Sequence, residues 1–229
     1  MAIKAALFDA YGTLLDVHSA TRQLVATARY PKLIDKEAQL SEIWRLRQLH
    51  YSWLRALMGA YVPFWQCTQD ALDFALAQTE LSGDDDLRAD LLQLYRRIDA
   101  YDDGLAILEA LPSVPCAILS NGNHEMLQDA VSHAGLAPLL DKILSVEDVG
   151  IFKPAPAVYQ MGCDAFDVRP EEVLFLSSNG WDIAGARHFG FHCIWVNRSN
   201  QPPEQLGDGP HHIVSNLHEA LAIAKQMIA

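Results

Sequence analysis

The chain has 229 residues, of which 50% are hydrophobic and 20% charged, and its formal net charge is −12 at pH 7. This composition is typical of a globular protein with enough apolar material for a core, and it excludes disordered, collagen-like and coiled-coil chains. The acidic balance disfavours nucleic acid and anionic lipid, so we expect no nucleic-acid partner and no membrane partner.

The N-terminal part of the chain predicts one buried strand followed by a long helical region. Residues 3–8 are predicted as a buried strand, with an apolar run at residues 5–8, and the Gly12-Thr13 turn follows it. From about residue 20 to residue 100 the apolar side chains recur at helical spacings, and strand-like runs are missing. The clearest helical stretches are residues 38–57, 70–77 and 87–98.

Strands and helices alternate after residue 101. Strands are predicted at residues 115–120, 143–145, 173–176 and 193–196. Helices are predicted at residues 124–133, 156–166 and 182–189. Such alternation implies a parallel sheet with right-handed crossovers. We therefore predict an α/β fold with a doubly wound parallel-sheet core, residues 1–16 and 101–229, and an all-helical cap, residues 17–100, inserted after the first strand.

Four polar sites follow predicted strands, at the edge of the sheet where ligands bind in this class of fold. They are residues 9–13, residues 120–121, the region of Lys153, and residues 177–182. Asp9 comes directly after an apolar strand, where a carboxylate can act as a nucleophile, a base or a metal ligand. Taken singly, Asp9 is explained by a turn, Lys153 by a solvated surface charge and Asp182 by a helix cap. The combination of all four sites is what predicts a reaction centre.

The same four sites are sequence motifs that occur in a fixed order. They are Asp9-Ala10-Tyr11-Gly12-Thr13-Leu14, Leu119-Ser120-Asn121-Gly122, Lys153-Pro154 and Ser177-Ser178-Asn179-Gly180-Trp181-Asp182. In this order they resemble the motifs of the haloacid dehalogenase superfamily and, more narrowly, those of the L-2-haloacid dehalogenases. Residues 51–55, 131–136 and 185–191 extend the resemblance over almost the whole chain.

The superfamily also contains phosphatases, and Tyr11 favours a dehalogenase. Related phosphatases have a second Asp at this position, which protonates the departing alkoxide, and a phenol with a pKa near 10 cannot easily replace it. A halide leaves as a stable anion and needs no proton. Those phosphatases also bind magnesium through an Asp where this chain has Ser178, so we expect no metal and no cofactor. A magnesium-dependent small-metabolite phosphatase stays the alternative, and a non-catalytic ligand-binding protein is a third hypothesis.

The resemblance implies a hydrolase for a small-molecule substrate, a short L-2-haloalkanoic acid. Asp9 would displace the halide with inversion and form an ester, and water would hydrolyse this ester to release a D-2-hydroxy acid. The residue that takes the proton from the water stays open, as does the choice of halide or substrate carboxylate as the anion bound by Arg45. The implied catalytic residues are Asp9, Thr13, Arg45, Ser120, Asn121, Lys153, Ser177, Asn179 and Asp182. The implied substrate-binding residues are Tyr11, Leu49, Phe64, Tyr159 and Trp181.

Other sequence signals concern location and assembly. The four cysteines form no C-x-x-C pair, which is typical of reduced thiols in a cytoplasmic protein. The first apolar run is too short for a signal peptide or a membrane span, and no later window approaches twenty uncharged apolar residues. No histidine spacing typical of a metal site and no glycine-rich nucleotide loop is present. Related dehalogenases are commonly dimers, so a homodimer is expected.

Overall fold

A six-stranded sheet forms the centre of the protein, whose computed structural model describes residues 2–111 and 114–228. The strand order is β3-β2-β1-β4-β5-β6, and all five strand pairings are parallel. The strands are β1 (Ala5–Phe8), β2 (Cys116–Ser120), β3 (Lys142–Ser145), β4 (Val173–Ser177), β5 (His192–Val196) and β6 (His212–Val214). The three central strands are buried along their whole length, which explains why they are continuous apolar runs in the sequence.

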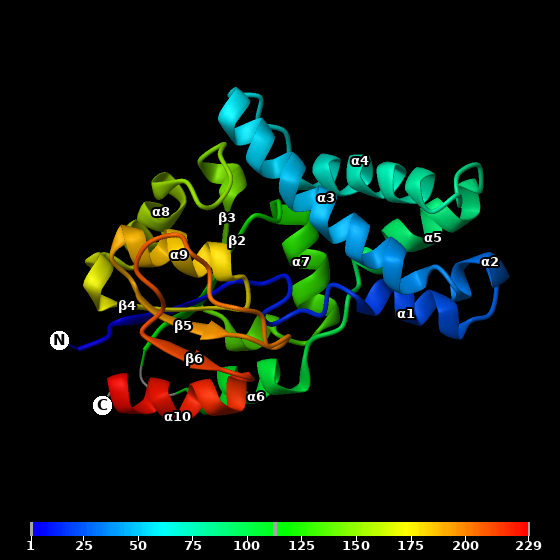
Figure 1. Cartoon of the computed structure of the whole chain (residues 1–229). Coiled ribbons are helices and arrows are strands. Elements are labelled where there is room, and N and C mark those ends of the chain that lie inside the picture. Colours follow the sequence, from blue (N-terminus) through cyan, green and yellow to red (C-terminus); the bar gives the residue numbers. More distant parts are fainter. Residues whose placement is uncertain (1, 112–113, 229) are drawn as a thin grey trace.

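Helices cover both faces of the sheet, as expected for a doubly wound fold. Figure 1 shows α8 and α9 on one face and α6 and α10 on the other. The helices of this part are α6 (Asp102–Ala110), α7 (His124–His133), α8 (Pro156–Phe166), α9 (Gly180–Phe189) and α10 (Leu217–Ile228). Three short 3₁₀ helices complete it: η1 (Ala137–Leu139), η2 (Val146–Asp148) and η3 (Pro170–Glu172). The predicted α/β class is therefore confirmed.

Residues 17–100, all of which the structure describes, contain helices and no strand. The helices are α1 (Ser19–Ala26), α2 (Pro31–Ile34), α3 (Glu37–Met58), α4 (Phe64–Gln78) and α5 (Asp85–Tyr95). The long helix α3 ends where Gly59 adopts a left-handed conformation with φ of 64°, and α4 packs along it. Figure 1 shows this helical part to the upper right of the sheet.

The chain passes between the sheet and the helical part twice, and the two crossings lie side by side. Leu15 pairs with Ala100 in an antiparallel bridge, and the Asp16 N–H donates to the Asp99 carbonyl at 2.8 Å. A division into a core and a cap at these crossings stays a proposal, which this pairing of the two linkers supports.

The structure differs from the sequence predictions mainly in short or weakly patterned elements. Two helices, α6 and α10, and the three-residue edge strand β6 were not predicted as elements. Helix α6 begins with Asp102-Asp103-Gly104, which reads as a turn, and two of the buried positions of α10 are alanines, which give a weak hydrophobic signal. Among the described helices, none is both long and apolar enough to cross a membrane.

Candidate active site

Asp9 lies at the point where the strand order of the sheet reverses. It directly follows β1, which pairs with β2 on one side and with β4 on the other, so the loops after all three strands meet around it. The loop turns sharply because the N–H groups of Thr13, Leu14 and Leu15 all bond to the Ala10 carbonyl, at 3.2, 3.0 and 3.0 Å. Gly12 has φ of +95°, a conformation that side chains disfavour, so glycine is needed at this turn.

Three donors hold the carboxylate of Asp9, whose side chain is only 8% exposed. Lys153 Nζ donates to Asp9 Oδ1 at 3.2 Å. Asn179 Nδ2 and Thr13 Oγ1 donate to Asp9 Oδ2 at 2.8 and 3.0 Å. A carboxylate has about four lone-pair sites, so one site on Oδ1 stays free of these donors.

Lys153 lies between two carboxylates in the interior. Its side chain is fully buried, and Nζ is 2.7 Å from Asp182 Oδ2 and 3.2 Å from Asp9 Oδ1. Burial alone would lower the pKa of Lys153, but the charges of Asp182 and Asp9 outweigh this effect and raise it. Lysine therefore stays protonated and neutralises part of the charge that Asp9 carries.

Asp182 belongs to the first turn of α9 and is fully buried. Burial raises its pKa to about 6, and the positive charge of Lys153 opposes that rise. The hydroxyl of Tyr159 donates to Asp182 Oδ1 at 2.8 Å, which also favours the ionised form. The N-cap position of α9 is occupied by Asn179, so Asp182 lies inside the helix and its carboxylate pairs with Lys153.

A cavity of about 10 Å³ lies directly against Asp9. It is lined by Asp9, Tyr11, Arg45, Leu49, Phe64, Ser120, Asn121, Asn179 and Trp181. Every one of these residues was predicted as a site residue from the sequence. The cavity has about the volume of a single water molecule, so a substrate requires the walls to move.

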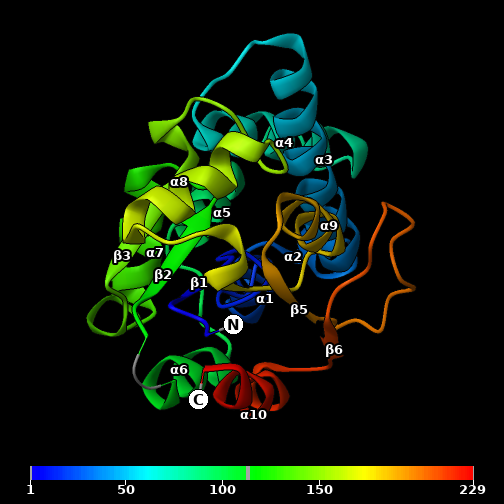
Figure 2. The same ribbon diagram turned by 90° about the vertical axis from the view of Figure 1, so that its left-hand side faces the viewer.

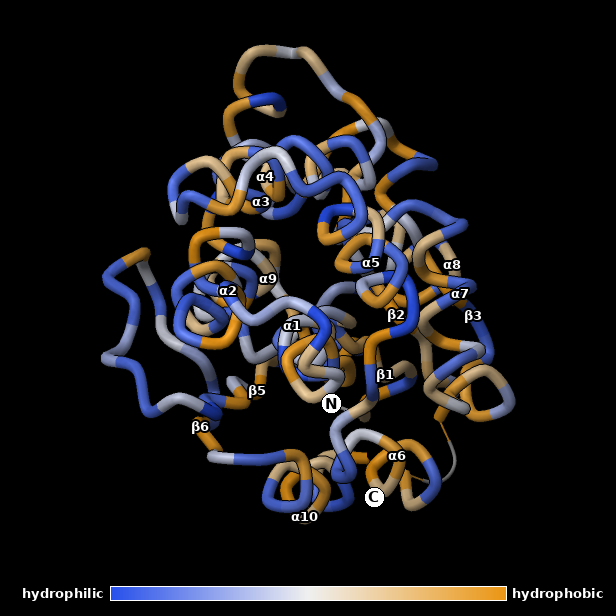
Figure 3. The backbone as a smooth tube through the Cα atoms, turned by 90° about the vertical axis from the view of Figure 1, so that its right-hand side faces the viewer, coloured by the Kyte–Doolittle hydropathy of each residue, from blue (hydrophilic) through white to orange (hydrophobic). Residues whose placement is uncertain are grey.

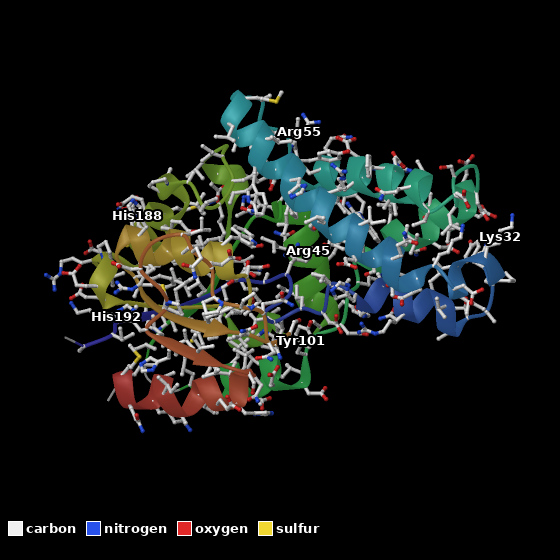
Figure 4. The ribbon with its side chains drawn as sticks, in the orientation of Figure 1. Lys32, Arg45, Arg55, Tyr101, His188 and His192 are labelled. Carbon is white, nitrogen blue, oxygen red and sulfur yellow. The ribbon has the colours of Figure 1, made fainter. Side chains whose placement is uncertain are left out.

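Arg45 brings a positive charge from α3 to this cavity. Figure 4 shows it on the side of α3 that faces the sheet. One of its nitrogens, Nη2, donates to the Tyr11 carbonyl at 3.1 Å and to Asn179 Oδ1 at 3.3 Å. Within the described residues no carboxylate lies within 4.0 Å of the Arg45 guanidinium, so its charge is available for an anionic ligand.

A buried polar network behind Arg45 was missed by the sequence reasoning. Gln48 accepts a hydrogen bond from Arg45 Nη1 at 3.0 Å and donates to Thr68 Oγ1 at 2.7 Å and to the Tyr95 hydroxyl at 3.0 Å. Gln48 lies one helical turn from Arg45 on α3, which was the available sequence signal. This network fixes the guanidinium over the cavity.

The apolar side of the cavity includes Tyr11, whose ring stacks on Tyr95 with centroids 5.8 Å apart. Burial and the neighbouring Tyr95 raise the pKa of Tyr11 well above 10. Among the described residues its hydroxyl has no hydrogen-bond partner. Tyr11 is therefore a neutral phenol and a very weak acid at physiological pH.

Five of the predicted site residues lie outside the cavity wall: Thr13, Lys153, Ser177, Tyr159 and Asp182. Tyr159 packs behind Asp182 among aromatic rings and acts on the site through its hydrogen bond to that carboxylate. Lys153 does not follow a strand directly, because β3 ends at Ser145 and η2 and a loop come between. The Ser177 hydroxyl accepts from the Asn179 N–H at 3.1 Å and so shapes the loop after β4.

Ser178 occupies the position where a related phosphatase would place a magnesium ligand. Its hydroxyl donates to the Gly12 carbonyl and contacts Thr13 Oγ1 at 3.1 Å. Within the described part of the chain no group of three or more His, Cys, Asp and Glu residues is arranged to hold a metal ion. Lys153 Nζ already provides a positive charge beside Asp9.

Fold and site together define a haloacid dehalogenase-like hydrolase, the family whose sequence profile matches residues 3–190. The chain is 47% identical to (S)-2-haloacid dehalogenase 1 of Pseudomonas sp. (strain CBS-3) over 95% of its own length and 94% of that protein. It is 46% identical to (S)-2-haloacid dehalogenase 4A of Burkholderia cepacia, covering 95% and 93% of the two chains. The protein thus belongs to the (S)-2-haloacid dehalogenase family of these hydrolases.

A solved structure supports the same assignment. The L-2-haloacid dehalogenase of Xanthobacter autotrophicus with chloropropionic acid covalently bound superposes with a TM-score of 0.87 at 35% identity, covering 98% of this chain and 99% of that one. Chloropropionic acid is covalently bound in that relative, and a nucleophilic carboxylate forms covalent adducts of this type.

Proposed function

We propose that the protein hydrolyses short L-2-haloalkanoic acids to D-2-hydroxy acids and halide through an ester on Asp9. The observation that carries this proposal is the Asp9 carboxylate, held by Lys153, Thr13 and Asn179, next to the guanidinium of Arg45. Nucleophile and anion acceptor border one small cavity, which is what displacement of a halide requires.

In the first step, Asp9 Oδ1 attacks the α-carbon of the substrate. This oxygen has one protein donor whereas Oδ2 has two, so Oδ1 keeps a lone pair available for the new carbon–oxygen bond. The carbon–halogen bond breaks on the opposite side, and the halide leaves with the bonding electrons. Attack from the rear inverts the α-carbon, so an L substrate leads to a D product.

In the second step, water attacks the carboxyl carbon of the Asp9 ester. The oxygen of the water enters the Asp9 carboxylate, and the original Oδ1 leaves with the product as its new hydroxyl. Loss of the ester restores the carboxylate beside Lys153. The amide of Asn179 stays within reach of this carbon because it already bonds to Asp9 Oδ2 at 2.8 Å.

Substrate binding follows from the charges at the cavity. Arg45 has no carboxylate partner among the described residues and attracts either the substrate carboxylate or the departing halide. Asn121 accepts from the Lys153 N–H through Oδ1, which leaves its Nδ2 as a donor for an anion. Leu49, Phe64 and Trp181 provide the apolar wall for the carbon chain.

The phosphatase alternative has less support. A phosphomonoesterase of this kind needs an acid for the departing alkoxide, and the buried Tyr11 phenol is a weaker acid than free tyrosine. Halide departure needs no such acid.

The proposal is tested with an Asp9→Asn variant and with isotope-labelled water. We expect Asp9→Asn to release halide from L-2-chloropropionate at least ~1000-fold more slowly than wild type. Asp35→Asn, which changes an exposed aspartate, is the matched control and keeps wild-type turnover. A single turnover in ¹⁸O-labelled water places the label in the peptide that contains Asp9. Product without label in that peptide refutes the ester intermediate.

We also propose a cytoplasmic homodimer. All four cysteines are free and buried, in keeping with a reducing compartment. Leu46 and Leu54 of α3 are about half exposed, at 50% and 54%, and provide apolar surface for self-association. Sedimentation velocity at micromolar concentration checks this state, and a monomer at all concentrations contradicts it.

A further inference from the structure

A second, larger cavity lies outside the reaction cavity. Its volume is about 500 Å³, within the range of small-molecule sites. We call it the vestibule. Its walls are Trp53, Ala56 and Leu57 of α3, residues 151–155 before α8, Trp181 of α9, and Leu206 of the loop between β5 and β6. These walls are almost entirely apolar, and the charged end of Lys153 is turned inward to Asp9 and Asp182.

The vestibule and the reaction cavity share a wall. Trp181 lines both of them. On the other side, Phe152 of the vestibule packs against Phe64 of the reaction cavity, with ring centroids 5.8 Å apart. The side chain of Trp181 therefore separates the space at Asp9 from the apolar space outside.

This dividing wall can move without breaking a hydrogen bond. The Trp181 ring meets Trp53 edge to face, with centroids 5.2 Å apart. Among the described residues, neither indole N–H has a hydrogen-bond partner. The two rings are held by packing alone, so their displacement costs contact area but no buried hydrogen bond.

The outermost wall belongs to an exposed loop. Residues 199–209 are exposed throughout, and the Leu206 side chain is 60% exposed although it is apolar. Figure 2 shows this loop extending from β5 to β6, and Figure 3 shows that it is largely hydrophilic. It also reaches the start of α9, because a Cβ added at Gly180 would lie 2.8 Å from Cγ of Glu204. An apolar side chain on a polar loop thus faces Trp181 and Trp53.

We propose that the vestibule binds the distal alkyl chain of 2-haloalkanoic acids longer than the short substrates named above. The inference rests on the proposed function and extends its substrate class. The carboxylate and the α-carbon of the substrate stay in the reaction cavity, next to Arg45 and Asp9. The alkyl chain of the substrate passes Trp181 and lies between Leu57 and Leu206. The reaction cavity of about 10 Å³ has no room for such a chain, whereas the adjoining 500 Å³ has.

The expected effect is a gain in binding with chain length. A methylene that is fully removed from water favours binding by about fourfold. Because the vestibule is open on one side, we expect about two- to threefold for each of the first few methylenes that enter it.

The test compares L-2-bromo acids of three, four, six and eight carbons. We expect kcat/KM of wild type to be at least as high for the six- and eight-carbon acids as for the three-carbon acid. Leu57→Gln and Leu206→Gln each place a polar group in the vestibule and should lower the ratio of eight-carbon to three-carbon kcat/KM at least tenfold. Ile34→Gln changes a half-exposed aliphatic residue of α2 that does not line the vestibule, and it should leave the ratio as in wild type.

Binding without turnover gives a second readout. Titration with propionate and octanoate, followed by tryptophan emission, should show tighter binding of octanoate in wild type and loss of that preference in Leu57→Gln. This arm is independent of halide release. Failure to dehalogenate the three-carbon acid therefore refutes the proposed function, while octanoate binding still decides about the vestibule.

Two results overturn the inference. One is a wild-type kcat/KM that falls steadily beyond four carbons together with equal affinity for propionate and octanoate. The other is a Leu57→Gln variant that changes the sedimenting mass but not the chain-length profile. That second result identifies the vestibule as an interface between copies of the chain.

Discussion

Replacement of Lys153 by methionine removes the cation that lies between two buried carboxylates. The ammonium is 2.7 Å from Asp182 and 3.2 Å from Asp9, and its side chain is fully buried. At an effective dielectric constant of about 20, these distances correspond to attractions of about 6 and about 5 kcal/mol. Desolvation of the three ions offsets most of this sum.

The cost of the substitution is larger than the net value of the ion pairs, because the carboxylates stay behind. Removing one partner of a buried pair typically destabilises a protein by about 3–5 kcal/mol. We expect a loss of this size in the free energy of unfolding at pH 8. We also expect halide release to fall at least ~100-fold, since the lysine no longer orients Asp9.

The loss should depend on pH. Burial already raises the pKa of Asp182 to about 6 with the lysine present, and removal of the positive charge raises this pKa further. An acid whose pKa is higher in the folded than in the unfolded state lowers the free energy of unfolding once it is ionised. This penalty reaches its full size at pH values above the pKa of the folded state. This penalty shrinks as the pH falls toward the unfolded pKa of about 3.9. The difference between variant and wild type should therefore be widest at pH 8 and narrower at pH 5.

The assay is urea unfolding followed by tryptophan fluorescence, at pH 8 and at pH 5. Lys32→Met, which changes an exposed lysine of α2, is the control and should stay within about 0.5 kcal/mol of wild type. A loss below about 1 kcal/mol at pH 8, or a loss that is the same at both pH values, contradicts the account of Lys153 given above.

Three further outcomes are expected. Tyr159→Phe removes a hydrogen bond that lowers the pKa of Asp182. We expect the acid limb of the kcat–pH profile near pH 6 in wild type and at higher pH in this variant. An acid limb at the same pH in both proteins contradicts a positioning role for Tyr159. Gln48→Leu removes a hydrogen bond that holds the Arg45 guanidinium and should lower kcat/KM about tenfold, while the circular dichroism spectrum stays that of wild type. Unaltered kinetics would show that Gln48 does not position Arg45. Treatment with EDTA should leave halide release unchanged, and phosphate release that EDTA abolishes would instead favour the magnesium-dependent phosphatase.

Local sequence signals were sufficient to predict the bounds of a helix where a glycine or a proline marks its end. Helix α7 covers residues 124–133 as predicted, because Gly135 with φ of 71° stops it. Helix α8 begins at Pro156, whose fixed φ suits the first helical position. Helix α9, by contrast, begins at Gly180 and not at residue 182, since its start depends on the loop that Ser177 and Asn179 form around Asp9.

The amino-acid sequence by itself determined the α/β class and the four motifs, and the resemblance that these motifs carry named the residues that line the reaction cavity. The class and the polar sites follow from apolar periodicity and from polar residues placed after strands, both of which are local properties. Arg45, Leu49 and Phe64 were implied by the resemblance alone. Tertiary structure alone decided how close Lys153 lies to its two carboxylates and how completely they are buried, that Tyr159 and Gln48 act from behind the cavity, and that an apolar vestibule adjoins Trp181. The distances between these side chains, their burial and the unpaired charge of Arg45 arise only when segments far apart in the chain pack together, so no local pattern encodes them.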